Sequence, residues 1–177
     1  DMIIDLKNSF IIPGLIDAHC HATLPGESAI SPLDVLTIMN QQKRNHIQQI
    51  KQGVTTIRDM GAMPKLLHDH IKQIEKGELI GPRVVYCNSF TNIYGGHPDI
   101  DPSKISIFSP LVMAFAGDTN LWFKDINDLE EKMRKNSASG ASFIKLTMDK
   151  KSVLCGKGEI PAYTDELDAY ITLILSL

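Results

Sequence analysis

The chain has 177 residues, of which 43% are hydrophobic and 22% are charged, a balance typical of a folded domain with a sizeable core. Its formal net charge of −3 argues against binding to nucleic acid or to an anionic membrane surface. No apolar run approaches the roughly 20 residues that a membrane-spanning helix needs. The three cysteines lie far apart, which indicates reduced thiols and a cytoplasmic location.

The first thirteen residues predict a small β-hairpin. Two mostly apolar stretches, residues 2–6 and 10–12, flank a Lys-Asn-Ser turn, which is typical of two short strands joined by a tight connection. We interpret residues 1–13 as the remnant of a small β domain and residues 14–177 as the main domain.

Residues 14–21 read Gly-Leu-Ile-Asp-Ala-His-Cys-His, and they predict a buried strand that ends in a His-x-His pair. Alternate side chains of a strand share a face, so His19, His21 and Asp17 should point one way and Cys20 the other. The two imidazoles would lie about 6.6 Å apart along the strand and could converge on one metal ion or a close pair. The alternative is two polar residues at the end of an ordinary strand.

A second His-x-His pair, His68 and His70, lies in a stretch with helical character. Positions two residues apart on a helix are separated by about 200° around its axis. These two side chains therefore cannot share a metal, and we expect solvated helix residues.

The remaining elements alternate between helices and strands. Helices, most of them ended by a glycine, are expected at residues 31–52, 65–76, 125–140 and from 164 onward. Strands are expected at residues 54–59, 83–89 and 142–148, with a long loop over 90–124. This order predicts an α/β fold with a parallel sheet, either a four-stranded open sheet or the first half of a (β/α)8 barrel. A whole barrel usually needs about 250 residues.

Lys145 is the second informative residue. In a strand it shares a face with Phe143 and Thr147, and a lysine in an interior strand is costly unless it is paired. Burial favours the neutral amine, which can react with carbon dioxide to give a carbamate, a group able to bridge two metal ions. The alternative is a lysine that reaches the strand end and pairs with Asp149.

Three further positions carry polar chemistry. His97 lies in the loop sequence Tyr-Gly-Gly-His-Pro-Asp, next to Tyr94, where glycines allow a ligand to approach the backbone and a histidine can exchange a proton. A surface turn is the alternative there. Arg58 and Asp59 end a strand, and we interpret them as a structural ion pair rather than as lining for the site.

Four segments, IIPGLIDAHCH, GVTTIRDMG, GPRVVYCNSFTNIYGGH and GASFIKLTMD, resemble successive segments of the amidohydrolase superfamily in the same order. The resemblance is strongest to imidazolonepropionase-related enzymes and to Xaa-Pro or Xaa-Arg dipeptidases. It implies a partial TIM (β/α)8 barrel, about the first four βα units preceded by the hairpin remnant. Residues 14–177 would then form the N-terminal half of the barrel.

This resemblance also implies a function and its residues. His19, His21 and Lys145, the last as a carboxylated lysine, would bind two divalent metal ions, with zinc expected. His97 would be catalytic and would contact the substrate together with Tyr94. The expected activity is metal-dependent hydrolysis of an amide or dipeptide carbon–nitrogen bond in a small molecule.

The resemblance has a limit, because the family needs two more metal-binding histidines and an aspartate on later strands. We therefore expect this chain alone to be inactive, and to pair with a second copy of itself or with the remainder of a barrel. Three alternatives remain: a non-catalytic half-barrel that needs a partner, an imidazolone or cyclic-amide hydrolase, and an open doubly wound sheet. Against the open doubly wound sheet, this sequence has no glycine-rich phosphate loop after its first strand, a loop that is typical of that fold.

Overall fold

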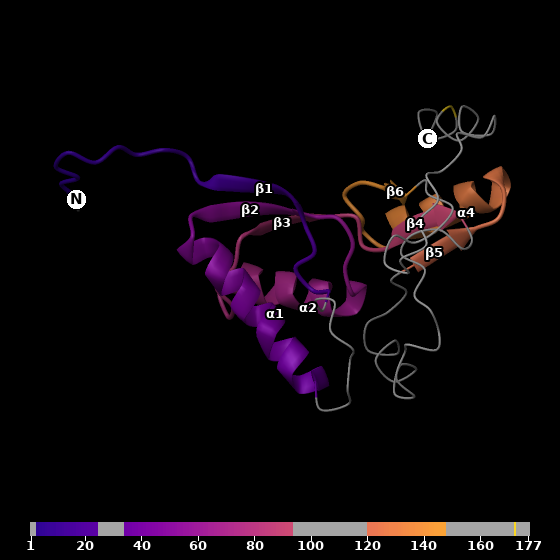
Figure 1. Cartoon of the computed structure of the whole chain (residues 1–177), viewed down its shortest axis with the longest axis horizontal. Coiled ribbons are helices and arrows are strands. Elements are labelled where there is room, and N and C mark those ends of the chain that lie inside the picture. Colours follow the sequence, from indigo (N-terminus) through magenta and orange to yellow (C-terminus); the bar gives the residue numbers. More distant parts are fainter. Residues whose placement is uncertain (1–2, 25–33, 94–119, 148–171, 173–177) are drawn as a thin grey trace, which may run out of the picture.

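A computed structural model of the chain describes residues 3–24, 34–93, 120–147 and 172 (Figure 1). Its strands are β1 (Leu15–Cys20), β2 (Val54–Asp59), β3 (Arg83–Tyr86), β4 (Phe90–Ile93), β5 (Asn120–Phe123) and β6 (Lys145–Thr147). Its helices are α1 (Asp34–Lys51), α2 (Pro64–Glu75) and α4 (Ile126–Ala138). None of the helices in these ranges is long and apolar enough to cross a membrane.

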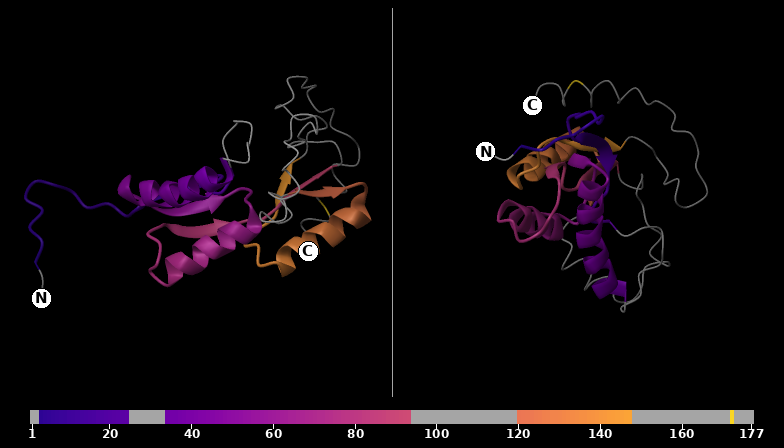
Figure 2. Two further views of the ribbon diagram at one scale, coloured as in Figure 1. Left: turned by 90° about the horizontal axis from the view of Figure 1, so that it is seen from below. Right: turned by 90° about the vertical axis from the view of Figure 1, so that its left-hand side faces the viewer.

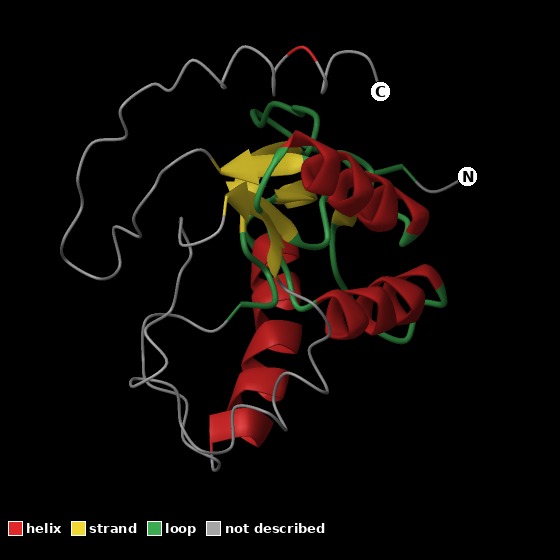
Figure 3. Ribbon diagram, turned by 90° about the vertical axis from the view of Figure 1, so that its right-hand side faces the viewer, coloured by secondary structure: helices red, strands yellow, loops and turns green. Residues whose placement is uncertain are grey.

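The strands form two parallel sheets. One has the order β1-β2-β3 and the other the order β5-β4-β6, and every described pairing is parallel. Helices α1 and α2 lie on one side of the first sheet, and α4 lies beside the second (Figures 1 and 3). The chain passes between the sheets through the three residues that separate β3 from β4. The predicted parallel α/β arrangement is thus confirmed.

The helix ends follow from local backbone rules, as the sequence predicts. Gly53, Gly77 and Gly140 have φ angles of 83°, 73° and 92°, a left-handed conformation that glycine adopts without steric cost and that ends a helix. At the other end of α4, the Asp125 side chain accepts hydrogen bonds from the N–H groups at the second and third helical positions. This is the ordinary N-cap arrangement.

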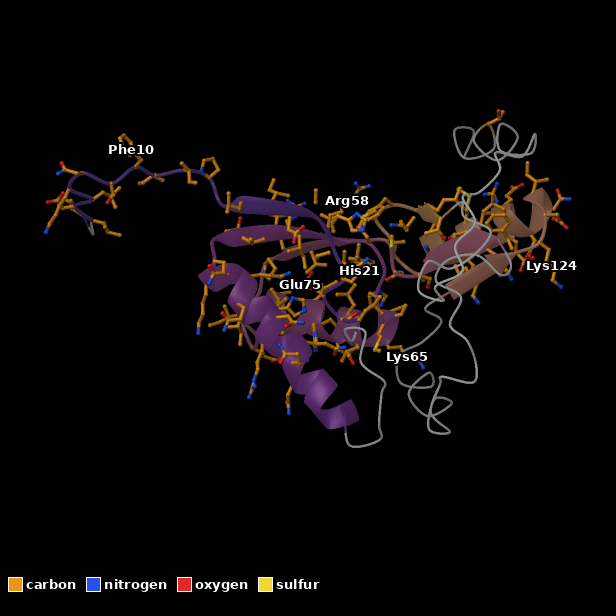
Figure 4. The ribbon with its side chains drawn as sticks, in the orientation of Figure 1. Phe10, His21, Arg58, Lys65, Glu75 and Lys124 are labelled. Atoms are coloured by element: carbon orange, nitrogen blue, oxygen red, sulfur yellow. The ribbon has the colours of Figure 1, made fainter. Side chains whose placement is uncertain are left out.

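The predicted N-terminal hairpin is wrong in its strands but right in its turn. The N–H of Ser9 donates to the carbonyl of Leu6 at 2.9 Å, yet residues 3–14 contain no strand. A lone two-stranded hairpin is only marginally stable in water, and the segment extends away from the sheets (Figures 1 and 2). Phe10 is 97% exposed, and Figure 4 shows it on this extended segment.

The first strand is present at the predicted place, but it is not buried. Leu15 and Ile16, which point to opposite faces, are 52% and 70% exposed. The reason is position: β1 is the edge of its sheet and pairs only with β2 in the described part. Burial of an apolar run depends on what covers it, and this cannot be read from the run itself.

The predicted loop over residues 90–124 is also wrong at both of its ends. Phe90 pairs with Asn120 and Ile93 with Phe123, which makes β4 and β5 a parallel pair. Residues 83–89 do not form one strand, because Asn88 has a φ of 60°, which interrupts an extended chain. β6 is likewise shorter than predicted. Residues 94–119 and the predicted helix from 164, apart from residue 172, lie outside the described ranges.

The prediction that His68 and His70 are solvated is wrong. His70 is fully buried, together with Leu67 three residues earlier on α2. His68 is partly buried, and its Nε2 lies 2.8 Å from Oδ1 of Asn88. The helical spacing of apolar residues does not reveal this, because a histidine can occupy a buried position when its ring nitrogens find partners.

Candidate metal centre

The His-x-His pair lies at the carboxyl end of β1, with His19 near the end of the strand and His21 directly after it. The two ring centroids are 5.5 Å apart, with an angle of 66° between the ring planes, and both residues are exposed. The pairing of β1 with β2 is irregular between Asp17 and Cys20, and the N–H of His19 donates to Oδ1 of Asp17 at 3.0 Å. The two imidazoles are therefore neighbours at an end of the strand where its pairing is irregular.

The orientation of His21 is set by a backbone carbonyl. Its Nδ1 lies 3.0 Å from the carbonyl oxygen of Gly61. Because a carbonyl oxygen can only accept, Nδ1 carries the proton, and the lone pair of the neutral ring lies on Nε2. Metal-binding histidines typically have one ring nitrogen held by a carbonyl or carboxylate in this way.

Asp59 holds the loop that follows His21. It ends β2 and is fully buried; the N–H of Ala22 donates to its Oδ2 at 2.9 Å, and the N–H of Gly61 donates to its Oδ1 at 3.0 Å. Burial raises the pKa of Asp59 to about 6, while the two hydrogen bonds act in the opposite direction. One carboxylate thus joins the loop after β1 to the loop after β2.

The predicted ion pair between Arg58 and Asp59 is replaced by a different arrangement. Neighbouring residues of a strand point to opposite faces, so Asp59 is buried while Arg58 is exposed. The Arg58 guanidinium lies 4.2 Å from the ring centroid of Phe143, a cation–π contact. Figure 4 labels Arg58 and His21 near the carboxyl ends of the first sheet. Sequence reasoning missed the role of Asp59, whose only signal is an aspartate at a strand end ahead of a glycine.

Thr23 fixes the same loop to both helices of the first sheet. It is fully buried; its hydroxyl oxygen accepts a hydrogen bond from the N–H of Met63 at 2.9 Å, just before α2. Its carbonyl accepts one from the Gln42 side chain on α1. Backbone and side-chain hydrogen bonds therefore hold the segment after His21 from three directions.

Lys145 lies on the second sheet, at the start of β6, where it pairs with Phe90. It is partly buried. Its charge acts on the thiol of Cys87: burial and then the Asp59 carboxylate raise the pKa of that thiol to about 12, and Lys145 opposes them. Since the N–H of Cys87 donates to the carbonyl of Asp59 at 3.1 Å, Lys145 belongs to the same region as the end of β2.

Neither described cysteine has the properties of a nucleophile. The pKa of Cys20 is also raised to about 12, by burial and then by the Asp59 and Asp17 carboxylates. A thiol with so high a pKa stays protonated at neutral pH.

Two predicted site residues, His97 and Tyr94, lie outside the described residues, as does Asp149. Within the described ranges no group of three or more histidine, cysteine, aspartate or glutamate side chains is placed to hold a metal ion. His19 and His21 fit part of such a site, because two imidazoles supply two of the four ligands that zinc usually takes. An unmodified lysine such as Lys145 is not a metal ligand at neutral pH.

The chain matches one protein-family model and several solved structures of similar fold. The family model described as "Amidohydrolase family" matches residues 10–171. A prolidase crystallised with N-methylphosphonate-L-proline aligns with 99% of this chain and 44% of its own, with a TM-score of 0.64 and 19% identity. A Xaa-Pro dipeptidase with methionine in its active site aligns with 93% of this chain and 41% of its own, with a TM-score of 0.64 and 22% identity.

The ochratoxinase of A. niger aligns with 76% of this chain and 33% of its own, with a TM-score of 0.55 and 19% identity. This chain thus spans less than half of the length of each of these three solved structures. At these identities the likeness is one of fold. A search of the curated proteins found no matching sequence.

Proposed function

This chain belongs to the amidohydrolase family, and we propose that it is part of a metal-dependent hydrolase that cleaves an amide or dipeptide carbon–nitrogen bond. Its family and its structural neighbours have a TIM-barrel-type fold, with which parallel strands and flanking helices agree. The family is generally metal-dependent. The count of four βα units, and the assignment of residues 1–13 to a separate β domain, stay predictions.

The observation that carries the proposal is the imidazole pair at the end of β1. His19 and His21 are neighbours at 5.5 Å between ring centroids, and the Gly61 carbonyl holds the His21 ring with its lone pair on Nε2. Imidazole nitrogen suits zinc among the common divalent ions. When bound, the metal lowers the pKa of a water molecule towards 7 and polarises the carbonyl that is to be cleaved.

We further propose that Lys145 adds to this site as a carbamate. The support is its partly buried place at the start of β6 and its electrostatic proximity to Cys87, next to the end of β2. A carbamate offers two oxygens and a negative charge, which suits two divalent ions. The chain's own residues then divide the work: His19, His21 and Lys145 hold metal, while Asp59 and Thr23 hold the loop.

The proposed substrate is a dipeptide or a similar small amide. The support is the fold shared with a prolidase and with a Xaa-Pro dipeptidase. His97 and Tyr94 stay predicted substrate contacts, with His97 also the predicted catalytic residue. Hydrolysis of an imidazolone or another cyclic amide is the alternative reaction, and assays on both substrate classes separate the two.

The metal proposal is tested by measuring zinc bound to the purified chain and to a His19→Ala, His21→Ala double variant. We expect the double variant to lose the bound zinc, because both imidazoles are removed. His68→Gln is the matched control, since it removes a histidine that is bonded to Asn88 instead and should keep the zinc. Equal zinc in the natural chain and the double variant would contradict the proposal.

A further inference from the structure

We propose that Asp59 is a positioning residue that sets the orientation of His21 without touching the metal. The inference rests on the proposed metal site, of which His21 is a member. Asp59 is distinct from the residues assigned to that site by family resemblance, because its side chain accepts hydrogen bonds from backbone groups on either side of the histidine ring.

The geometry is a closed circuit of hydrogen bonds. Oδ2 of Asp59 accepts from the N–H of Ala22 at 2.9 Å, the residue bonded to His21. Oδ1 accepts from the N–H of Gly61 at 3.0 Å. The carbonyl oxygen of the same Gly61 accepts a hydrogen bond from Nδ1 of His21 at 3.0 Å. One carboxylate therefore fixes both the backbone that carries the ring and the residue whose carbonyl selects its tautomer.

The position of the carboxylate is itself fixed by the sheet. Asp59 is paired with Cys20 across β1 and β2, and the N–H of Met60 donates to the carbonyl of Cys20 at 2.8 Å. On the other side, the N–H of Cys87 donates to the carbonyl of Asp59 at 3.1 Å. The two side-chain oxygens are thus held at the strand ends before any ligand arrives, which is the condition for a preorganised site.

The residue type fits this role. A fully buried carboxylate is costly unless it is well bonded, and the described partners of Asp59 are two backbone N–H groups rather than a cation. Two donors facing one side chain need two acceptor oxygens. An asparagine has one acceptor and one donor group, so Asp59→Asn keeps the shape and loses one of the two bonds.

The test uses the full chain and its Asp59→Asn variant. Zinc affinity is measured by competition with a coloured chelator, and the His21 tautomer is read from the 15N shifts of its ring in the metal-free protein. We expect about 10- to 100-fold weaker zinc binding and a mixture of His21 tautomers in the variant. In the natural chain, we expect the Nδ1–H tautomer alone.

Leu129→Ala is the matched control for lost stability. Leu129 is fully buried in the core of the second sheet, so this change lowers stability but leaves the loop hydrogen bonds in place. It should keep both the tautomer and the zinc affinity. If Leu129→Ala weakens zinc binding as much as Asp59→Asn does, or if Asp59→Asn changes neither readout, the positioning role is wrong.

The two readouts separate this inference from the proposed function. If the natural chain binds no zinc, the metal site is wrong, while the tautomer measurement still decides whether Asp59 orients His21. If the natural chain binds zinc but Asp59→Asn binds it equally and shows the same His21 tautomer, only the positioning role fails. A His21 ring in the Nε2–H tautomer in the natural chain contradicts the circuit whether or not Asp59→Asn folds.

Discussion

At the scale of single residues, the polar interior between α1 and α2 is the feature that sequence reasoning did not anticipate. His46 and His70 are both fully buried, and Nε2 of His46 lies 3.2 Å from Nδ1 of His70. Burial and then the nearby His70 lower the pKa of His46 to about 4. Burial and then Lys43 lower the pKa of His70, and Asp69 opposes them. Two neutral imidazoles thus share one hydrogen bond in the buried space between α1 and α2.

This pair predicts a loss of stability in acid. The unfolded chain binds protons on these histidines near pH 6.5, whereas folded His46 resists protonation until about pH 4. The contribution of these histidines to the free energy of unfolding should therefore be fully present above pH 6.5. It should fall as the pH drops towards 4, by on the order of 3 kcal/mol for His46 alone. Urea unfolding at pH 7.5 and 4.5 measures this difference.

A His46→Gln, His70→Gln double variant isolates the contribution of the pair. Asp59 acts with the opposite sign, because its folded pKa of about 6 lies above the usual 3.8, so its protonation stabilises the folded state as the pH falls below 6. That contribution is present in every variant and cancels in the comparison. The acid sensitivity does not come from this pair if the double variant loses as much free energy of unfolding between pH 7.5 and 4.5 as the natural chain does. A smaller loss in the His68→Gln control than in the natural chain would also contradict the role of the pair.

At the scale of elements, the junction between β3 and β4 is where α4 holds the two sheets together. Asn136 of α4 is buried, and its Nδ2 donates to the carbonyl of Cys87 at 2.8 Å and to that of Ser89 at 3.3 Å. Asn88 between them donates from its own Nδ2 to Oγ of Ser139 at 2.8 Å. The irregular backbone of this junction thus finds its hydrogen bonds in the end of one helix.

Asn136→Ala should destabilise the fold by about 1–3 kcal/mol, because it removes the side chain that donates to buried carbonyl groups of the junction. The free energy of unfolding in urea measures the effect. Ser137→Ala is the control: it changes the next residue of the same helix, whose side chain is exposed, and it should change stability by less than about 0.5 kcal/mol. A loss in the control as large as that in Asn136→Ala would argue against the junction.

At the scale of the whole molecule, the described surface contains an apolar area that begins with the N-terminal segment and continues onto β1. Its most exposed large side chains are Ile3, Phe10 and Ile11, at 92%, 97% and 79%, and the segment extends away from the sheets (Figure 1). Exposed apolar areas of this kind commonly mark interfaces, and β1 is an edge strand that can pair further. We propose that a second copy, or the remainder of a barrel, covers it.

Phe10→Asp should shift the chain towards the monomer if this area mediates self-association, because a charge at an apolar interface must be desolvated. Sedimentation velocity over a range of concentrations measures the shift. Ser9→Asp adds the same charge to the neighbouring residue without removing an apolar side chain, and it should associate like the natural chain. A natural chain that is monomeric at all concentrations would rule out pairing with a second copy.

The local sequence was enough for features that depend on a few neighbouring residues. Gly53, Gly77 and Gly140 end helices because a left-handed φ has little cost without a Cβ, and Asp125 caps α4 because its side chain reaches the first free N–H groups. The order of strands and helices likewise predicted parallel pairing. The closeness of His19 and His21 follows from their two-residue spacing, while their role as metal ligands stays a prediction.

Other features were decided only by tertiary structure, because they depend on residues distant in sequence. β4 and β5 exist through their mutual pairing across residues 94–119, the exposure of β1 depends on its place at a sheet edge, and His70 is buried because α1 supplies His46 as a partner. Asp59 belongs to the same class. Its bond from Gly61 is local, two residues along the chain, but its Oδ2 reaches the N–H of Ala22 only after β1 and β2 are paired, since hydrogen bonds between loops require the strands that bring those loops together.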